Sequence, residues 1–303
     1  MAARQALNEG QASILEEYKG KKVYLMSEGL LFETHSHTPL CKHAVGHPRE
    51  YAAVAEQRGL RGIFVTCHNP MPNGFSARVR MGVDEFDEYL ELVAAARAEW
   101  AGRVEVRLGI EADYFVGYES WLERQLGSAE FDFVLGSVHP QIAEFKERYW
   151  CDDPTEVQRT YFGLLADAAE TGLFDSLSHP DLIKNQMVAD WHPDKIMDDI
   201  RRALDRIAAT GVAMELNTSG ANKAIPEMNP FPAMLVEMSN RGIPVTLGAD
   251  AHHPSRVADG FDRALDLLSR CGYSRCSYYL DRERHDLAID SALASLVNSD
   301  LIC

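Results

Sequence analysis

The chain has 303 residues, of which 46% are hydrophobic and 25% are charged, a composition typical of a globular protein that forms one large α/β barrel or two smaller domains. Its formal net charge of −16 argues against nucleic acid as a partner, because phosphate backbones are bound by clustered lysine and arginine. The sequence contains no apolar run of about 18 residues, so we expect neither a membrane span nor a membrane partner.

Residues 1–28 are polar and lack the basic-then-apolar layout of a secretory signal. We expect them to form an N-terminal extension, followed by a single domain over residues 29–303. The six cysteines show no spacing of a disulfide framework. Without a secretory signal, this pattern favours free thiols and a cytoplasmic location.

Short apolar runs alternate along the chain with amphipathic segments of helical periodicity. The strand-like runs are residues 30–34, 62–66, 104–110, 131–137, 174–178, 211–217 and 243–249. Helices are predicted near residues 48–58, 83–101, 154–171, 193–210, 230–241 and 260–271. Pro48, Pro154 and Pro193 fit the first turns of three of these helices. The alternation predicts a parallel sheet with helical crossovers, and we expect a seven-stranded (β/α) barrel, with a doubly wound open sheet second.

Six of the seven strands end in side chains that can bind a metal ion. In chain order these are His35 and His37, His68, Glu111, His139, His179, and Asp250 with His252. His43 follows His37 by six residues, and the remaining strand ends in Asn217. A single histidine after a strand is more often structural, but the carboxyl ends of parallel barrel strands meet at one mouth, where active sites lie. The joint placement therefore predicts one cluster.

The nine side chains are histidines and carboxylates, which suit zinc, iron or manganese. They are too many for one ion and fit two or three. A polynuclear site can clamp the oxygens of a phosphate and generate hydroxide near neutral pH, so phosphoester hydrolysis uses this arrangement best. The other four histidines, His47, His192, His253 and His285, fall outside the pattern, although His253 could line the pocket beside His252.

The motifs "THSHTPLCKH", "TCHNPMP", "GIEADY", "GSVHP", "SHPDLIK" and "LGADAHHP" resemble those of the PHP (polymerase and histidinol phosphatase) family of metal-dependent phosphoesterases. The resemblance covers roughly residues 30 to 280. Within the family the chain is most similar to the histidinol-phosphate phosphatase branch, through "HTPLCKHAVGHPREY", "NPMP", "SHPDLIK" and "ELNTSG".

The resemblance implies a distorted seven-stranded barrel with a trinuclear metal site at the carboxyl ends of its strands. One ion would be held by His35, His37, Glu111 and Asp250. Glu111 would bridge to a second ion held with His139 and His179. A third would be bound by His43, His68 and His252. All nine positions carry the expected residue types, so we expect an active enzyme.

Two positions depart from the family pattern. Many relatives have an aspartate directly before His68, where this chain has Cys67, so a side chain that supports His68 would be lost. After His139 the loop reads "PQIAEFKERYW", unlike the branch, and loops at a barrel mouth set the substrate. The second departure weakens the substrate assignment and leaves the metal chemistry intact.

The predicted function is hydrolysis of a small phosphorylated substrate, with L-histidinol phosphate in histidine biosynthesis favoured. Another small phosphomonoester is the alternative, a nuclease or proofreading module is third, and a non-catalytic scaffold is last. Asp250, His252 and Glu111 are the predicted catalytic residues. Arg80, Lys184 and Lys223 are predicted to meet the phosphate or orient the substrate, and Asn217 its amino group. Solvated surface charges and a structural loop role are the alternatives for these four.

Overall fold

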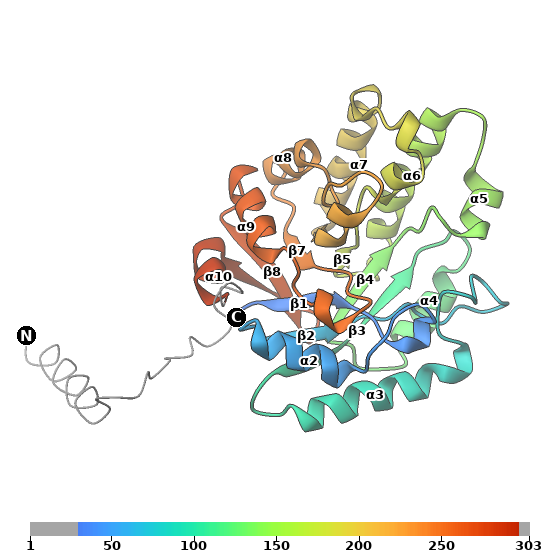
Figure 1. Cartoon of the computed structure of the whole chain (residues 1–303). Helices are drawn as coiled ribbons and strands as arrows, with labels where there is room; N and C mark the ends of the chain where they lie inside the picture. Colours follow the sequence, from blue (N-terminus) through green and yellow to red (C-terminus); the bar gives the residue numbers. More distant parts are fainter. Residues whose placement is uncertain (1–29, 297–303) are drawn as a thin grey trace, which may run out of the picture.

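The computed structural model describes residues 30–296, so the predicted extension over residues 1–28 lies outside the described part of the chain (Figure 1). A single sheet of nine strands organises this part, and its strands lie side by side in chain order. They are β1 Phe32–Ser36, β2 Gly62–Val65, β3 Glu105–Asp113, β4 Phe133–Ser137, β5 Ser176–Leu177, β6 Ala213–Asn217, β7 Val245–Gly248, β8 Arg275–Leu280 and β9 Glu283–Ala288.

The first seven strands confirm the predicted parallel arrangement. After β7 the chain returns to β1, because His37 N donates to Ala251 O at 3.0 Å and Ala251 N donates to His35 O at 2.9 Å. This parallel bridge makes the sheet barrel-like. The strands β8 and β9 were not predicted; they form an antiparallel hairpin that joins β7 through Thr246 and Ser277.

Helices surround the outside of the sheet (Figure 1). Six lie where the sequence predicts them: α2 Pro48–Gln57, α3 Phe86–Glu99, α6 Pro154–Glu170, α7 Met197–Thr210, α8 Pro232–Asn240 and α9 Phe261–Arg270. Pro48 and Pro154 occupy first-turn positions as expected, whereas Pro193 begins a short 3-10 turn, Pro193–Lys195, just before α7. The short helices α4 Glu119–Leu126, α5 Ala143–Tyr149 and α10 Ile289–Ser295 were not predicted.

Two sets of buried apolar side chains stabilise this arrangement. The larger set packs the helices against the sheet. The smaller set comes from five strands of the curved sheet and consists of Phe32, Phe64, Phe133, Leu135, Ala213 and Tyr279. An interior filled in this way is a packed core, so the polar side chains at the carboxyl ends of the strands are left to form a site. No helix within residues 30–296 is long and apolar enough to cross a membrane.

Candidate metal centre

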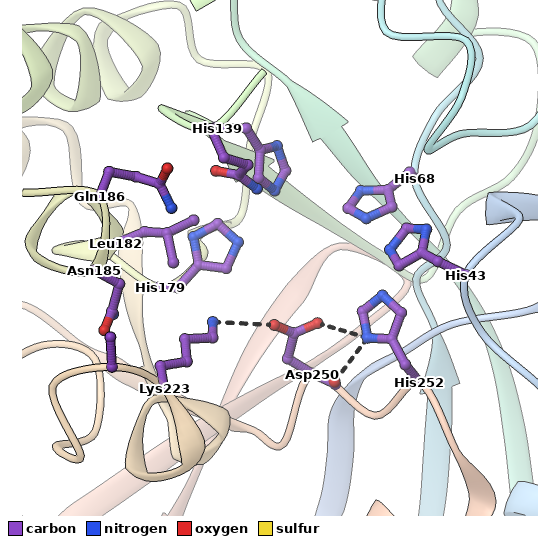
Figure 2. Close-up of a pocket in the computed structure, with 12 residues that line it drawn as sticks. His43, His68, His139, His179, Leu182, Asn185, Gln186, Lys223, Asp250 and His252 are labelled. Carbon is purple, nitrogen blue, oxygen red and sulfur yellow. Dashed lines mark hydrogen bonds and ion pairs between the residues drawn. The ribbon is translucent and has the colours of Figure 1, made fainter. Parts of the chain in front are cut away.

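A cavity of about 400 Å³ lies at the carboxyl ends of the parallel strands. Six of the nine predicted metal ligands line it: His43, His68, His139, His179, Asp250 and His252. Figure 2 shows His43, His68 and His252 together on one side, His139 and His179 on the other, and Asp250 between them. The other three, His35, His37 and Glu111, are almost completely buried and contact this group.

Glu111 is the centre of the cluster. Its Oε2 lies 2.8 Å from His68 Nδ1 and 3.4 Å from His35 Nε2. Its Oε1 lies 3.0 Å from His179 Nε2 and 3.4 Å from His139 Nε2. With His37 Nε2 at 3.8 Å from Oε2, the two carboxylate oxygens therefore face different sets of histidines, as they would in a carboxylate shared between two ions.

Asp250 connects the buried histidines to the cavity. Its Oδ1 lies 3.1 Å from His37 Nε2 and 3.3 Å from His252 Nδ1, while its Oδ2 lies 3.7 Å from Lys223 Nζ. Asp250 has a backbone φ of 49°, and His179 has one of 27°. Non-glycine residues adopt such left-handed conformations at a cost in backbone strain, which is concentrated at functional sites.

The cluster contains buried polar atoms that no hydrogen bond within residues 30–296 satisfies. They include His35 Nε2, His37 Nδ1, His68 Nδ1, His252 Nε2 and Glu111 Oε2. The 2.8 Å approach of His68 Nδ1 to Glu111 Oε2 lacks hydrogen-bond geometry. Unpaired buried polar atoms cost free energy and are rare in native proteins. Converging nitrogen and carboxylate oxygen atoms of this kind fit divalent metal ions.

Two further carboxylates hold these histidines in place. Glu215 Oε1 accepts from His35 Nδ1 at 2.8 Å, and Glu215 Oε2 accepts from the backbone N of His179 at 2.8 Å. Asp113 Oδ1 lies 2.8 Å from His139 Nδ1. Such partners fix the orientation and tautomer of a metal-binding imidazole. Sequence reasoning missed both, although each lies two residues from a predicted site residue on the same strand and so on the same face.

The charges within the cluster follow from burial and from these contacts. Burial opposes ionisation of Glu111 and Asp250, but nearby histidines outweigh it and hold the pKa of both carboxyls well below the usual range. Burial lowers the pKa of His68 to about 3. At His139 burial is overcome by Asp113 and Glu111, which raise its pKa to about 10. The carboxylates are therefore ionised at neutral pH, as metal binding requires.

The four predicted substrate contacts have different surroundings. Lys223 lines the cavity beside Asp250. Arg80 is 2% exposed, and its Nη2 lies 2.6 Å from Asp113 Oδ2; it lines a neighbouring cavity of about 790 Å³ that shares three histidines with the first. Only Lys223 is therefore brought to the metal-lined cavity itself.

The structure does not bring the other two predicted contacts to either cavity. Lys184 is fully buried, and its Nζ contacts Asp181 Oδ2 at 2.9 Å and Met228 O at 2.8 Å. Asn217 is also fully buried, donates to Glu215 Oε2 at 2.9 Å and accepts from the backbone N of Ser219. Both side chains are engaged in holding the surrounding loops and strands.

The remaining histidines lie outside the cluster, and Cys67 lies behind it against Thr38 and Cys41. His47 precedes α2, where its backbone N donates to Glu50 Oε2 at 2.6 Å, and His253 Nδ1 accepts from Ser255 N at 3.1 Å. His192 and His285 are exposed. Cys67 is buried, and its Sγ accepts from Thr38 N and Thr38 Oγ1 at 3.4 and 3.2 Å.

Buried histidines and carboxylates at the mouth of a barrel-like α/β fold are typical of metal-dependent hydrolases. The PHP domain family profile matches residues 33–219, more than half of the chain, so this protein belongs to the PHP family. The resemblance read from the motifs is confirmed.

Several relatives are named as histidinol-phosphatases. The chain is 41% identical over 252 residues to a probable histidinol-phosphatase of Deinococcus radiodurans, covering 80% of this chain and 94% of the relative. It is 24% identical over 267 residues to the histidinol-phosphatase of Bacillus subtilis, covering 78% and 98%. The Lactococcus lactis histidinol phosphate phosphatase, solved with zinc, L-histidinol and phosphate, has a similar fold, with a TM-score of 0.71, 21% identity, and coverage of 84% and 98%.

Proposed function

We propose that this protein hydrolyses a small phosphomonoester, and that the substrate is L-histidinol phosphate, which would yield L-histidinol and phosphate. One observation carries the proposal: six histidine and carboxylate side chains line a single cavity, and the buried His35, His37 and Glu111 contact them from behind. The relationship to the Deinococcus radiodurans protein supports the choice of substrate.

The chain offers ligands for two or three divalent ions, with zinc, manganese and iron as the candidates. His35, His37, Glu111 and Asp250 would hold one ion, and Glu111 would share a second with His139 and His179. His43, His68 and His252 would hold the third, and their ligand atoms lie within 4.8 Å of one another. Bound ions would supply activated water and neutralise the charge on the phosphate oxygens.

The protein's own side chains would bind and orient the substrate. Lys223 provides a positive charge at the cavity wall, where it would meet a phosphate oxygen. Gln141, Asn185 and Gln186 line the same cavity as uncharged donors and acceptors, which suits a polar alcohol. The neighbouring cavity beyond His139 offers further room for the alcohol part.

Asp250, His252 and Glu111 are the proposed catalytic residues. Glu111 places its carboxylate between two pairs of histidines, and Asp250 and His252 reach the cavity itself. The leaving alcohol needs a proton, and we place its source at the Asp250–His252 side of the cavity. Asp113 and Glu215 act through His139 and His35 and are positioning residues.

A turnover screen tests the proposal. Purified protein loaded with zinc or manganese is offered histidinol phosphate, mononucleotides, sugar phosphates and a generic aryl phosphate. We expect histidinol phosphate to have the highest kcat/KM, and His35→Ala and Asp250→Ala to abolish activity. Turnover of histidinol phosphate no faster than that of the aryl phosphate would remove this substrate and favour another small phosphomonoester. Absence of hydrolysis by metal-loaded protein with any substrate would remove the phosphatase function.

A further inference from the structure

A cysteine lies against the proposed metal centre and is outside the nine-residue ligand set. Cys41 is completely buried, and its sulfur lies within 4.8 Å of ligand atoms of both His37 and His252. It ends the 3-10 turn Pro39–Cys41, which connects the end of β1 to His43. A thiolate is a strong ligand for zinc, so the Cys41 sulfur, which lies among imidazoles, is a candidate metal ligand.

Two imidazoles beside Cys41 each have one ring nitrogen without a hydrogen-bond partner within residues 30–296. His37 is 1% exposed, its Nε2 faces Asp250, and its Nδ1 is buried without a hydrogen-bond partner in the described part of the chain. His252 Nδ1 faces Asp250, and its Nε2 is likewise buried and unpartnered. Two buried, unsatisfied nitrogens beside a buried sulfur therefore indicate that a cation lies close to Cys41.

The outer ion of the proposed centre is short of protein ligands. His43, His68 and His252 supply three, whereas zinc is commonly four-coordinate. His43 Nδ1 lies 2.7 Å from the carbonyl oxygen of Cys41, so residue 41 already orients this ligand and leaves His43 Nε2 for the ion. Lys42 between them has a φ of 70°, which turns the chain sharply between Cys41 and His43.

We propose that Cys41 adds its sulfur to the outer ion, whose other ligands are His43, His68 and His252. His252 links the two sets, because its ligand atom also lies within 4.8 Å of the Cys41 sulfur. On binding, the S–H bond breaks, the proton passes to solvent, and a sulfur–metal bond forms. This inference rests on the metal centre of the proposed function and adds a ligand to it. A soft sulfur ligand favours zinc or cobalt over manganese, so this position would select its ion differently from the other two.

Cobalt-substituted protein tests the proposal directly. The full chain is freed of metal, loaded with Co²⁺, and scanned in the near ultraviolet for a thiolate-to-cobalt charge-transfer band. We expect the band in the wild type and its loss in Cys41→Ser. Cys271→Ser and Cys151→Ser are the matched controls, because the buried Cys271 sulfur donates to Pro232 O and Cys151 is exposed, and both should keep the band.

Absence of the band in cobalt-loaded wild type, its survival in Cys41→Ser, or its loss in Cys271→Ser would each overturn the assignment. X-ray absorption at the zinc edge of the wild type needs no variant: it should show a sulfur neighbour at about 2.3 Å beside nitrogen and oxygen at about 2.0–2.1 Å. A shell of nitrogen and oxygen alone would overturn the proposal even if Cys41→Ser failed to fold.

Metal content and turnover of the same samples separate this inference from the proposed function. Protein that binds metal and hydrolyses histidinol phosphate without a sulfur signal would refute the Cys41 ligand and leave the phosphatase standing. A sulfur signal in protein without phosphatase activity would support the Cys41 ligand and refute the phosphatase function.

Discussion

Replacement of Glu215 by glutamine should weaken metal binding without touching any proposed ligand. The Glu215 carboxylate is completely buried and receives three donors: His35 Nδ1 at 2.8 Å, the His179 backbone N at 2.8 Å, and Asn217 Nδ2 at 2.9 Å. Glutamine has one carbonyl oxygen and one amide group that donates. If the carbonyl keeps the two donors on the Oε2 side, the amide faces His35 Nδ1.

The consequence for His35 is a change of tautomer. An amide donor at Nδ1 requires Nδ1 to accept, which places the imidazole proton on Nε2, the nitrogen that faces Glu111 and Asp250. A protonated Nε2 cannot bind a metal ion. Loss of such a supporting partner typically lowers metal affinity about 10–100-fold. At about 1.4 kcal/mol per tenfold, the change corresponds to about 1.4–2.8 kcal/mol.

The measurement is a chelator competition for zinc, combined with turnover at limiting and at saturating zinc. We expect weaker zinc binding in Glu215→Gln and a loss of turnover at limiting zinc that saturating zinc largely restores. Glu91→Gln, the same change at an exposed position of α3, should leave both unchanged. A folded Glu215→Gln protein with zinc affinity within about twofold of the wild type, well below the 10–100-fold expected, would refute the reasoning.

Four further predictions concern Gly248, Lys223, Lys184 and His139. In Gly248→Ala the new Cβ would lie 2.0 Å from Glu215 Oε1, so metal content and melting temperature should both fall. Gly163→Ala is the control, because its Cβ would meet nothing within 4 Å, and both quantities should stay unchanged. Lys223→Met should raise KM about tenfold or more, because a charged hydrogen bond contributes about 1.5–3 kcal/mol. Lys184→Met should instead destabilise the fold by about 3–5 kcal/mol in urea unfolding, because it leaves the buried Asp181 carboxylate without its positive partner. An unchanged KM for Lys223→Met, or an unchanged stability for Lys184→Met, would contradict these assignments. Neighbouring carboxylates overcome burial and raise the pKa of His139 to about 10 in the metal-free protein, so a bound ion must displace a proton from its imidazole. Zinc affinity should therefore rise with pH below that value, and calorimetry in two buffers should detect proton release on binding. A zinc affinity that does not change with pH would contradict this prediction.

The sequence predicted the parallel strands because strands covered on both faces read as continuous apolar runs, as "GIFVT" and "IPVTLGA" do. The strand β9, Glu283–Ala288, has no such run. Nearly all of its residues are exposed, and its sequence "ERHDLA" shows no alternation of apolar and polar residues. Its partner β8 buries only three of its six residues, Cys276, Ser277 and Tyr279. An edge hairpin of this kind forms because it pairs with the rest of the sheet, and the local sequence pattern of the hairpin does not show that pairing.

The positions of basic side chains in loops were the least predictable part of the site. Lys184 and Lys223 both follow strands on mouth-side loops, yet only Lys223 reaches the metal-lined cavity. The difference lies in partners: Lys184 has Asp181 three residues before it and Glu227 on a distant loop, which together hold its ammonium group inside the protein. The contact with Glu227 joins loops 43 residues apart and leaves no mark in either local sequence.

The departure at Cys67 changes meaning once its neighbours are known. The family pattern suggested that an aspartate at this position supports His68, but His68 Nδ1 faces Glu111, and the residue 67 side chain faces Thr38. Thr38 directly follows His37 and offers two donors, its backbone N and its hydroxyl, to whatever occupies position 67. A carboxylate and a sulfur can both accept from these donors. The requirement at position 67 is therefore an acceptor that anchors the chain just after His37, and a cysteine meets it without adding a buried charge.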